Sequence, residues 1–97
     1  MNGRAKILCV EDDEAVRESR CAVLKYSGYD VASASPEVAE VALRSQKFDL
    51  VIISSLSDSD LQRVVNFSDG AHVLILKELI MPSELLSLVA ESLQRRA

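Results

Sequence analysis

The sequence predicts an α/β fold in which a parallel sheet carries helices on both faces. Strand-like and helix-like segments alternate along the chain, which is the order that gives βαβ units. The segments at 6–10 and 48–54 are nearly continuous apolar runs, as is typical of parallel strands buried on both faces. A length of 97 residues suits one small domain, residues 1–97, with about four strands and four helices and no output domain.

The start of the chain is predicted to form a strand, a helix and a second strand. Residues 6–10 read KILCV and form the first strand, and the acids after them lead into a helix that Gly28 ends. Residues 29–35 read YDVASAS. They alternate enough in polarity for a second strand, which we expect to be more exposed than the first.

A second helix and a third strand follow. Pro36 suits the first helical position, and an apolar stripe of Val38, Val41 and Ala42 is expected to face the core. The third strand, 48–54, reads FDLVIIS, so an acid opens a buried run that a serine closes. A serine at the carboxyl end of a central strand stands where ligands and catalytic groups gather in open α/β sheets.

The second half of the chain predicts two helices and one strand. Residues 55–70 form a polar loop and a short helix, and residues 71–77 form the fourth strand. Residues 81–97 form the closing helix. Its expected apolar face consists of Leu85, Leu88, Val89 and Leu93.

Composition excludes several classes of function. The formal net charge is −4 and the pI about 4.9, which disfavours nucleic-acid binding through a general positive field. The apolar run near the N-terminus is too short for a signal peptide or a membrane span. Cys9 and Cys21 have neither CxxC spacing nor a nearby histidine pattern, so we expect buried free thiols in a cytoplasmic protein.

Four stretches of the chain resemble the receiver domain of two-component response regulators. They read ILCVEDDEAVR, SGYDVASASPEVAEVAL, FDLVIIS and GAHVLILKELIMPSELLSLV. The resemblance is almost free of gaps over residues 1–54. It implies a flavodoxin-like fold with the usual strand order 2-1-3-4-5, a role in bacterial signal transduction or a phosphorelay, and a phosphoryl-transfer site at the strand ends.

The resemblance assigns the residues of that site. Glu11 and Asp12 correspond to the family's acidic pair, with Asp12 the expected Mg²⁺ ligand. The family's phosphoacceptor aspartate, five residues after the acid of FD, falls on Ser54. The alignment has little freedom here, because a slip of one residue would turn every side chain of the strand to the other face.

The change from aspartate to Ser54 predicts a weakened site. A neutral hydroxyl brings no charge to a metal and needs a general base before it can attack phosphorus. We therefore expect weak or vestigial Mg²⁺ binding at Glu11 and Asp12 and no acyl-phosphate chemistry. Ser54 itself is predicted to be a structural hydroxyl that caps a loop rather than a nucleophile.

The second half departs further from the family, which would have a fourth and a fifth strand where this chain has one. In one alignment Gly70-Ala71 leads to the family's fifth strand, and Lys77 becomes the phosphate-pairing lysine. In the other, HVLIL is the family's fourth strand and Lys77 is an ordinary strand-end lysine. The position of Pro82 at a helix start favours the first.

The missing elements predict an uncovered flank on the closing helix. Leu86, Ala90 and Leu93 are the candidate residues for an interface with a second copy or another protein, so we expect a homodimer. The favoured function is an atypical, unphosphorylated pseudo-receiver that contacts a histidine kinase or another regulator. The alternatives are a small Mg²⁺-dependent phosphoryl-transfer or hydrolytic enzyme and a degenerate, self-associating remnant.

Overall fold

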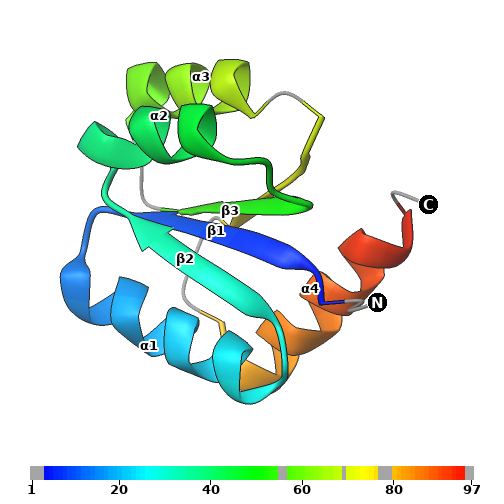
Figure 1. Cartoon of the computed structure of the whole chain (residues 1–97). Helices are drawn as coiled ribbons and strands as arrows, with labels where there is room; N and C mark the ends of the chain where they lie inside the picture. The colour runs from blue at the N-terminus through cyan, green and yellow to red at the C-terminus, as the bar shows by residue number, and fades with distance from the viewer. Residues whose placement is uncertain (1–3, 55–56, 69, 77–79, 96–97) are drawn as a thin grey trace.

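The computed structural model describes residues 4–54, 57–68, 70–76 and 80–95. In these ranges four strands and four helices alternate along the chain, as predicted (Figure 1). They are β1 (Lys6–Glu11), α1 (Glu14–Tyr26), β2 (Asp30–Ala34), α2 (Pro36–Ser45), β3 (Leu50–Ser54), α3 (Asp58–Phe67), β4 (His72–Leu76) and α4 (Pro82–Arg95). Gly28 ends α1 as expected, with a φ of 100° that disfavours other residues.

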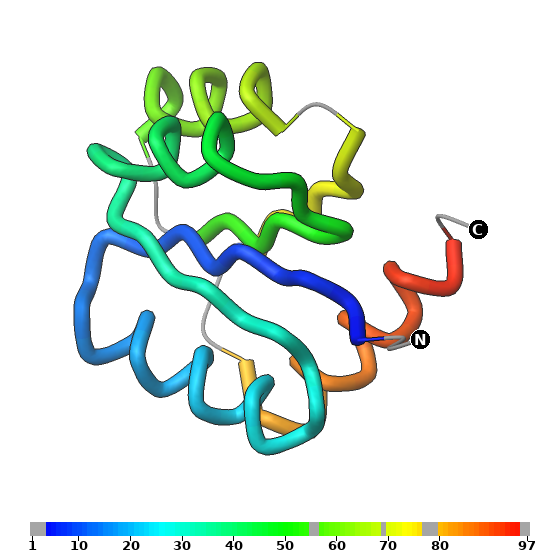
Figure 2. Tube along the Cα trace, viewed as in Figure 1, coloured from blue at the N-terminus to red at the C-terminus, as the bar shows by residue number. Residues whose placement is uncertain are grey.

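The four strands form one parallel sheet in the order β2-β1-β3-β4. Figures 1 and 2 show α2 and α3 on one face of this sheet and α1 and α4 on the other. In the register of the two central strands, Glu11 lies opposite Ser54, the last residue of β3. The predicted fold class is therefore confirmed, and the two polar residues that end β1 and β3 are neighbours at one edge of the sheet.

Two aliphatic clusters fill the space on the two faces, because successive side chains of a strand point to opposite sides. Ile7 and Cys9 of β1 face α1 and α4, whereas Leu8 and Val10 face α2 and α3. The first cluster consists of Ile7, Cys9, Cys21, Leu24, Val31, Leu50, Ile52, Leu76, Leu85 and Val89. The second consists of Leu8, Val10, Ala34, Ala39, Phe48, Val51, Ile53 and Val64.

β4 pairs directly with β3 and occupies the place that the fourth strand has in the order 2-1-3-4-5. In this sheet it has a neighbour on one side only, and Ile75 is 46% exposed. The helix after it, α4, packs on the face that carries α1 (Figure 2). Lys77, which the two alignments treat differently, lies outside the described residues.

The predicted apolar stripe of α2 is wrong in its rotation. Val38 is 51% exposed and Val41 is 64% exposed, whereas Ala39 is completely buried. Pro36 is also buried, and Ala42 packs partly against the second cluster. The small side chain of Ala39 lets the helix approach the sheet closely, so the valines on either side point outwards.

The closing helix α4 buries the face that was predicted for it. Leu85 and Val89 are buried, and Leu88 and Leu93 pack partly against the first cluster. Leu86 also packs partly against the first cluster. Of the three residues that were predicted to form an interface, Leu86 and Leu93 are therefore half-buried within the chain, and Ala90 is exposed. Within the described ranges, no helix has the length and apolar character that crossing a bilayer requires.

Candidate functional site

The candidate site lies at the carboxyl end of the two central strands. Glu11 ends β1 and Ser54 ends β3, and both residues are buried, with 2% and 4% of the residue surface exposed. By the alternation along the strands, Glu11 follows Ile7 and Cys9 onto the side of the sheet that carries α1. Ser54 follows Leu50 and Ile52 onto the same side, so both polar groups face the first helix.

Arg20 of α1 completes the site. The buried residues of this helix are Arg20, Cys21 and Leu24, which places the arginine on the side that packs against the sheet. Asp13 sets the start of the helix, since its carboxylate accepts a hydrogen bond from the Val16 N–H at 3.1 Å. An arginine in the second turn of a helix that begins at a strand end can reach back to that end.

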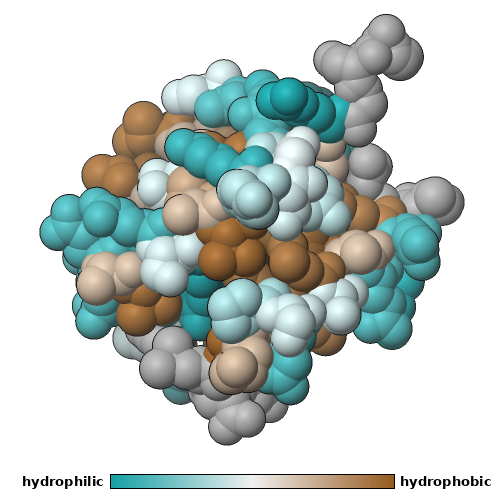
Figure 3. Space-filling model, turned by 90° about the horizontal axis from the view of Figure 1, so that it is seen from below, coloured by the Kyte–Doolittle hydropathy of each residue, from teal (hydrophilic) through white to brown (hydrophobic). Residues whose placement is uncertain are grey.

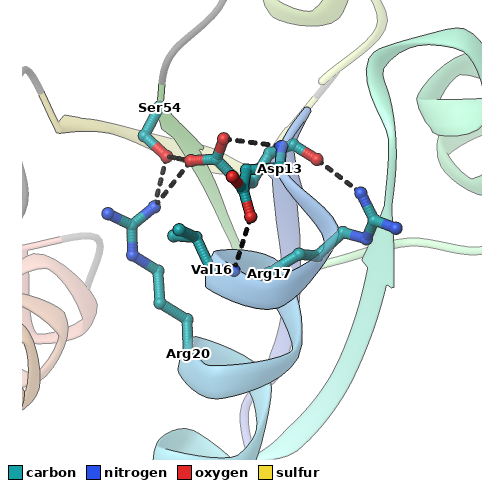
Figure 4. A network of polar contacts seen from close by, with 6 residues as sticks. Asp13, Val16, Arg17, Arg20 and Ser54 are labelled. Atoms are coloured by element: carbon teal, nitrogen blue, oxygen red, sulfur yellow. Dashed lines mark hydrogen bonds and ion pairs between the residues drawn. The ribbon is translucent and has the colours of Figure 1, made fainter.

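The three side chains form one compact hydrogen-bonded cluster (Figure 4). The Ser54 hydroxyl donates to Glu11 Oε1 at 2.5 Å. Arg20 Nη1 donates to the same carboxylate oxygen at 3.3 Å and also to Ser54 Oγ. A buried carboxylate is thus neutralised by a buried guanidinium, and the serine hydroxyl bridges the two groups.

The second carboxylate oxygen and the backbone carbonyl oxygen of Glu11 also accept hydrogen bonds. Its Oε2 accepts a hydrogen bond from the Asp13 backbone N–H at 3.0 Å, and its carbonyl oxygen accepts one from Arg17 Nη1 at 2.7 Å. Throughout the described residues, every buried side-chain nitrogen and oxygen has a hydrogen-bond partner. Both oxygens of the Glu11 carboxylate are therefore committed to groups of the chain itself.

Glu11 and Asp12, which were predicted to bind a metal ion together, lie in different surroundings. Asp12 is exposed and forms no hydrogen bond or ion pair with the described residues, whereas Glu11 is buried in the cluster. The Ser54 hydroxyl is bound to Glu11 and Arg20. Its predicted role as a structural cap of the following loop stays a prediction, because residues 55–56 lie outside the described residues.

These residues do not fit the Mg²⁺ site that the receiver fold implies. Magnesium needs two or more oxygen ligands that are free to face it in near-octahedral geometry. Glu11 has both carboxylate oxygens engaged, Asp12 is exposed and has no hydrogen bond to the described part of the cluster, and Ser54 is neutral. In the part of the chain that the structure describes, no group of three or more acidic, histidine or cysteine side chains could hold a metal ion.

Arg20 was missed at the level of sequence, although a signal for it was present. Arg17, Arg20, Cys21 and Leu24 have the spacing of one helical face, and this face is the one that packs on the sheet. A charged residue in the middle of such a face requires a buried partner. Glu11 is that partner, and nothing in the local pattern indicates the distance between them.

Two buried free thiols lie on the same side of the sheet as this cluster, as predicted. Cys9 of β1 and Cys21 of α1 belong to the first aliphatic cluster. Burial raises the pKa of the Cys9 thiol to about 12, with a smaller rise from Cys21 and a small opposing effect of Arg20. Cys9 is therefore an inert, protonated thiol at neutral pH.

The surface formed by α1 and α4 is hollowed. One cavity of about 250 Å³ is lined by Ala15, Val16, Ser19, Arg20 and Ile80. Another of about 360 Å³ is lined by Ile80, Ser83, Glu84, Ser87 and Leu88. Figure 3, which shows this face from below, has apolar residues gathered at its centre and polar residues around them.

Solved structures with the same fold share these elements. The chemotaxis protein CheY4 of Vibrio cholerae is 18% identical with a TM-score of 0.79, over 93% of this chain and 99% of that chain. The receiver domain of the hybrid histidine kinase CckA is 25% identical with a TM-score of 0.78, over 92% and 99%. A response regulator receiver protein from Sinorhizobium medicae is 16% identical with a TM-score of 0.78, over 98% of each chain.

The comparisons thus define the class of fold. The chain has the CheY-like, flavodoxin-like fold of response regulator receiver domains, and it is structurally similar to receiver domains of two-component systems. No family model matches the chain, and no curated protein matches its sequence significantly.

Proposed function

We propose that this chain is a pseudo-receiver: a signalling module with the receiver fold that takes no phosphoryl group, at Ser54 or at another residue, and acts through protein contacts. The observation that carries the proposal is the hydrogen bond from Ser54 Oγ to Glu11 Oε1 at 2.5 Å within a buried cluster. The hydroxyl stands where the resemblance places the phosphoacceptor, and it serves to join two side chains of the protein.

The chemistry of Ser54 supports this proposal. An acyl phosphate needs a carboxylate as acceptor, which a hydroxyl cannot replace. Attack by the hydroxyl itself would need an open path for the phosphorus atom towards Oγ. That oxygen is bound to Glu11 and also accepts a hydrogen bond from Arg20, and the side chain is 4% exposed.

Other acids offer weak substitutes for the acceptor. Asp58 lies in the exposed first turn of α3, and Asp60 forms an ion pair with Arg63 at 2.8 Å. Asp12 and Asp13 are exposed as well, and Asp13 is committed to capping α1. In the described part of the chain, none of these four belongs to a group of three or more acidic, histidine or cysteine side chains that could hold the metal ion of a phosphoryl-transfer site.

Protein contacts are the remaining mode of action, and the similar structures suggest the class of partner. One of them belongs to a chemotaxis protein and another to a hybrid histidine kinase. By analogy, we propose that this chain contacts a histidine kinase or another regulator of a two-component system. Self-association through α4 would present two copies of its contact surface at once.

The test is a phosphorylation assay that is read by intact mass. The wild-type chain is incubated with acetyl phosphate and Mg²⁺, and we expect no mass increase of one phosphoryl group. Ser54→Ala is the matched control, because it removes only the hydroxyl. An adduct that wild type gains and Ser54→Ala lacks would contradict the proposal.

The stability of any adduct identifies its chemistry. A phosphoserine survives hydroxylamine, whereas an acyl phosphate on an aspartate is cleaved by it. An adduct that Ser54→Ala retains and hydroxylamine removes would place an acceptor at another acid, and Asp12→Asn, Asp58→Asn and Asp60→Asn would then locate it. That result would also refute the proposal, since the module would be phosphorylated after all.

A further inference from the structure

We propose that the guanidinium of Arg20 is the resident cation of this site and takes the place that the resemblance assigns to Mg²⁺. The proposal deepens the function proposed above at the same site and rests on it, since a module that receives no phosphoryl group has no need of an exchangeable metal ion. Its test measures metal binding, so the two can fail independently.

Charge is the first argument. Glu11 is buried at the end of a central strand, and a buried carboxylate must be paired with a cation or lose its charge. Arg20 supplies that cation from within the chain, with side-chain exposures of 9% for Arg20 and 3% for Glu11. Together with the neutral Ser54, the cluster has no net charge left to attract a divalent ion.

Geometry is the second argument. A divalent ion bound to Glu11 would lie roughly 2.0–2.6 Å from a carboxylate oxygen. Oε1 already accepts hydrogen bonds from Arg20 Nη1 and Ser54, and Oε2 accepts one from the Asp13 N–H. An ion at Oε1 would therefore have to displace the guanidinium or be repelled by it at close range.

The approach to the site is the third argument. Arg20 lines the cavity of about 250 Å³ beside α1, and its other lining residues are Ala15, Val16, Ser19 and Ile80. Among the described residues that line this cavity there is no carboxylate. An ion in this cavity would lie near the Arg20 guanidinium, whose positive charge opposes its binding.

The experiment is a titration with Mg²⁺ in which isothermal calorimetry measures the binding. Wild type should show no saturable binding up to about 10 mM, a range that covers weak protein sites for divalent ions. Ser54→Asp should still bind weakly, because Arg20 can pair with the new carboxylate as well as with Glu11. Ser54→Asp combined with Arg20→Gln should bind at least about tenfold more tightly than Ser54→Asp alone.

The matched control removes a different arginine. Arg44 forms an exposed ion pair with Glu40 on α2, with Nη2 and Oε2 2.9 Å apart. Ser54→Asp combined with Arg44→Gln has the same net charge as the Arg20 double variant but keeps Arg20 beside Glu11. It should bind Mg²⁺ no better than Ser54→Asp, which separates the position of the charge from its amount.

Folding is checked by circular dichroism, and thermal melts with and without Mg²⁺ give a second readout. Arg20→Gln keeps a hydrogen-bond donor near Glu11, and Arg20→Met in the Ser54→Asp background is the second variant. Saturable Mg²⁺ binding by wild type that Glu11→Gln abolishes would overturn the proposal. Equal binding by Ser54→Asp and its folded Arg20 variants would overturn it too.

The wild-type titration and that of Ser54→Asp do not depend on whether the Arg20 variants fold. Tight Mg²⁺ binding by Ser54→Asp alone would show that Arg20 excludes nothing and would also overturn the proposal. A phosphoserine on wild type would refute the proposed function, whereas the metal titrations would still decide the role of Arg20.

Discussion

Arg20 of α1 and Glu11 of β1 form a buried ion pair, with Nη1 and Oε1 3.3 Å apart. A buried pair of this kind gives little net stability compared with apolar residues of the same size. Removing one partner is different, because it leaves an unpaired charge in the core. We therefore expect the pair to set the arrangement of α1 against the end of β1 more than it adds to the free energy of unfolding.

Breaking this pair is expected to be costly. Arg20→Met should lower the free energy of unfolding by about 3–5 kcal/mol, because Glu11 keeps its buried carboxylate without a cation. The double variant Arg20→Met with Glu11→Gln should lose less than the sum of the two single changes. Urea unfolding measures each value.

The control for this cycle is the exposed pair of α2. Arg44→Met removes the partner of Glu40, whose side chain is 35% exposed, and should cost about 0.5 kcal/mol or less. If Arg20→Met were as mild as Arg44→Met, the buried pair would not exist in solution.

The buried thiol of Cys9 predicts a loss of stability at high pH. Its pKa is about 12 in the folded chain and 9.0 in its ordinary state, so the folded form holds the proton more tightly. Stability from this group is complete below about pH 9 and falls as the pH rises towards 12. Between pH 8 and 10.5 the loss should be about 2 kcal/mol.

The variant Cys9→Ala distinguishes the effect of Cys9 on the pH dependence of stability from the effects of lysine and tyrosine side chains. Its free energy of unfolding should be lower at pH 8, because a buried side chain is truncated, but it should fall less steeply with pH than that of wild type. Parallel pH slopes for the two proteins would contradict the assignment.

The rotation of α2 can be tested with a pair of substitutions. Ala39 is fully buried, so Ala39→Leu should overpack the second cluster and cost about 1–3 kcal/mol. Val41 is 64% exposed, so Val41→Lys should change stability by about 0.5 kcal/mol or less. If Val41→Lys lowered the free energy of unfolding more than Ala39→Leu, the buried stripe would instead consist of Val38, Val41 and Ala42.

Self-association is expected to depend on the exposed position of α4. Light scattering should give the mass of two chains for wild type. Ala90→Glu should weaken the dimer about 100-fold, because it places a charge between Leu86 and Leu93 on the candidate interface. Ala90 is exposed, so the fold should persist, and circular dichroism checks this.

A wild-type chain that scatters as a monomer over the whole concentration range would refute the homodimer. So would a dimer that Ala90→Glu leaves intact, since the interface would then lie elsewhere. The half-buried state of Leu86 and Leu93 already limits how much apolar surface α4 can offer to a partner.

Much of the fold could be predicted because its signals are local. The apolar runs at β1 and β3, the glycine that ends α1 and the proline that begins α4 each act within a few residues of themselves. Helix rotation was harder to predict, and α2 shows why. The valines and alanines of α2 are compatible with more than one apolar stripe. The way the helix packs on the sheet buries the stripe that contains Ala39.

The candidate site also has one part that the sequence predicted and another that depends on tertiary packing. The sequence by itself placed Ser54 at the end of one buried strand and Glu11 directly after another, because apolar runs mark the strands, and the resemblance to receiver domains implied that these strands are neighbours. Only the tertiary structure decided that Arg20 joins them, since this depends on how Cys21 and Leu24 seat α1 against the sheet. A serine at the aspartate position that the resemblance implies can be found within one strand, whereas the buried cation beside it comes from a different element and is set by packing.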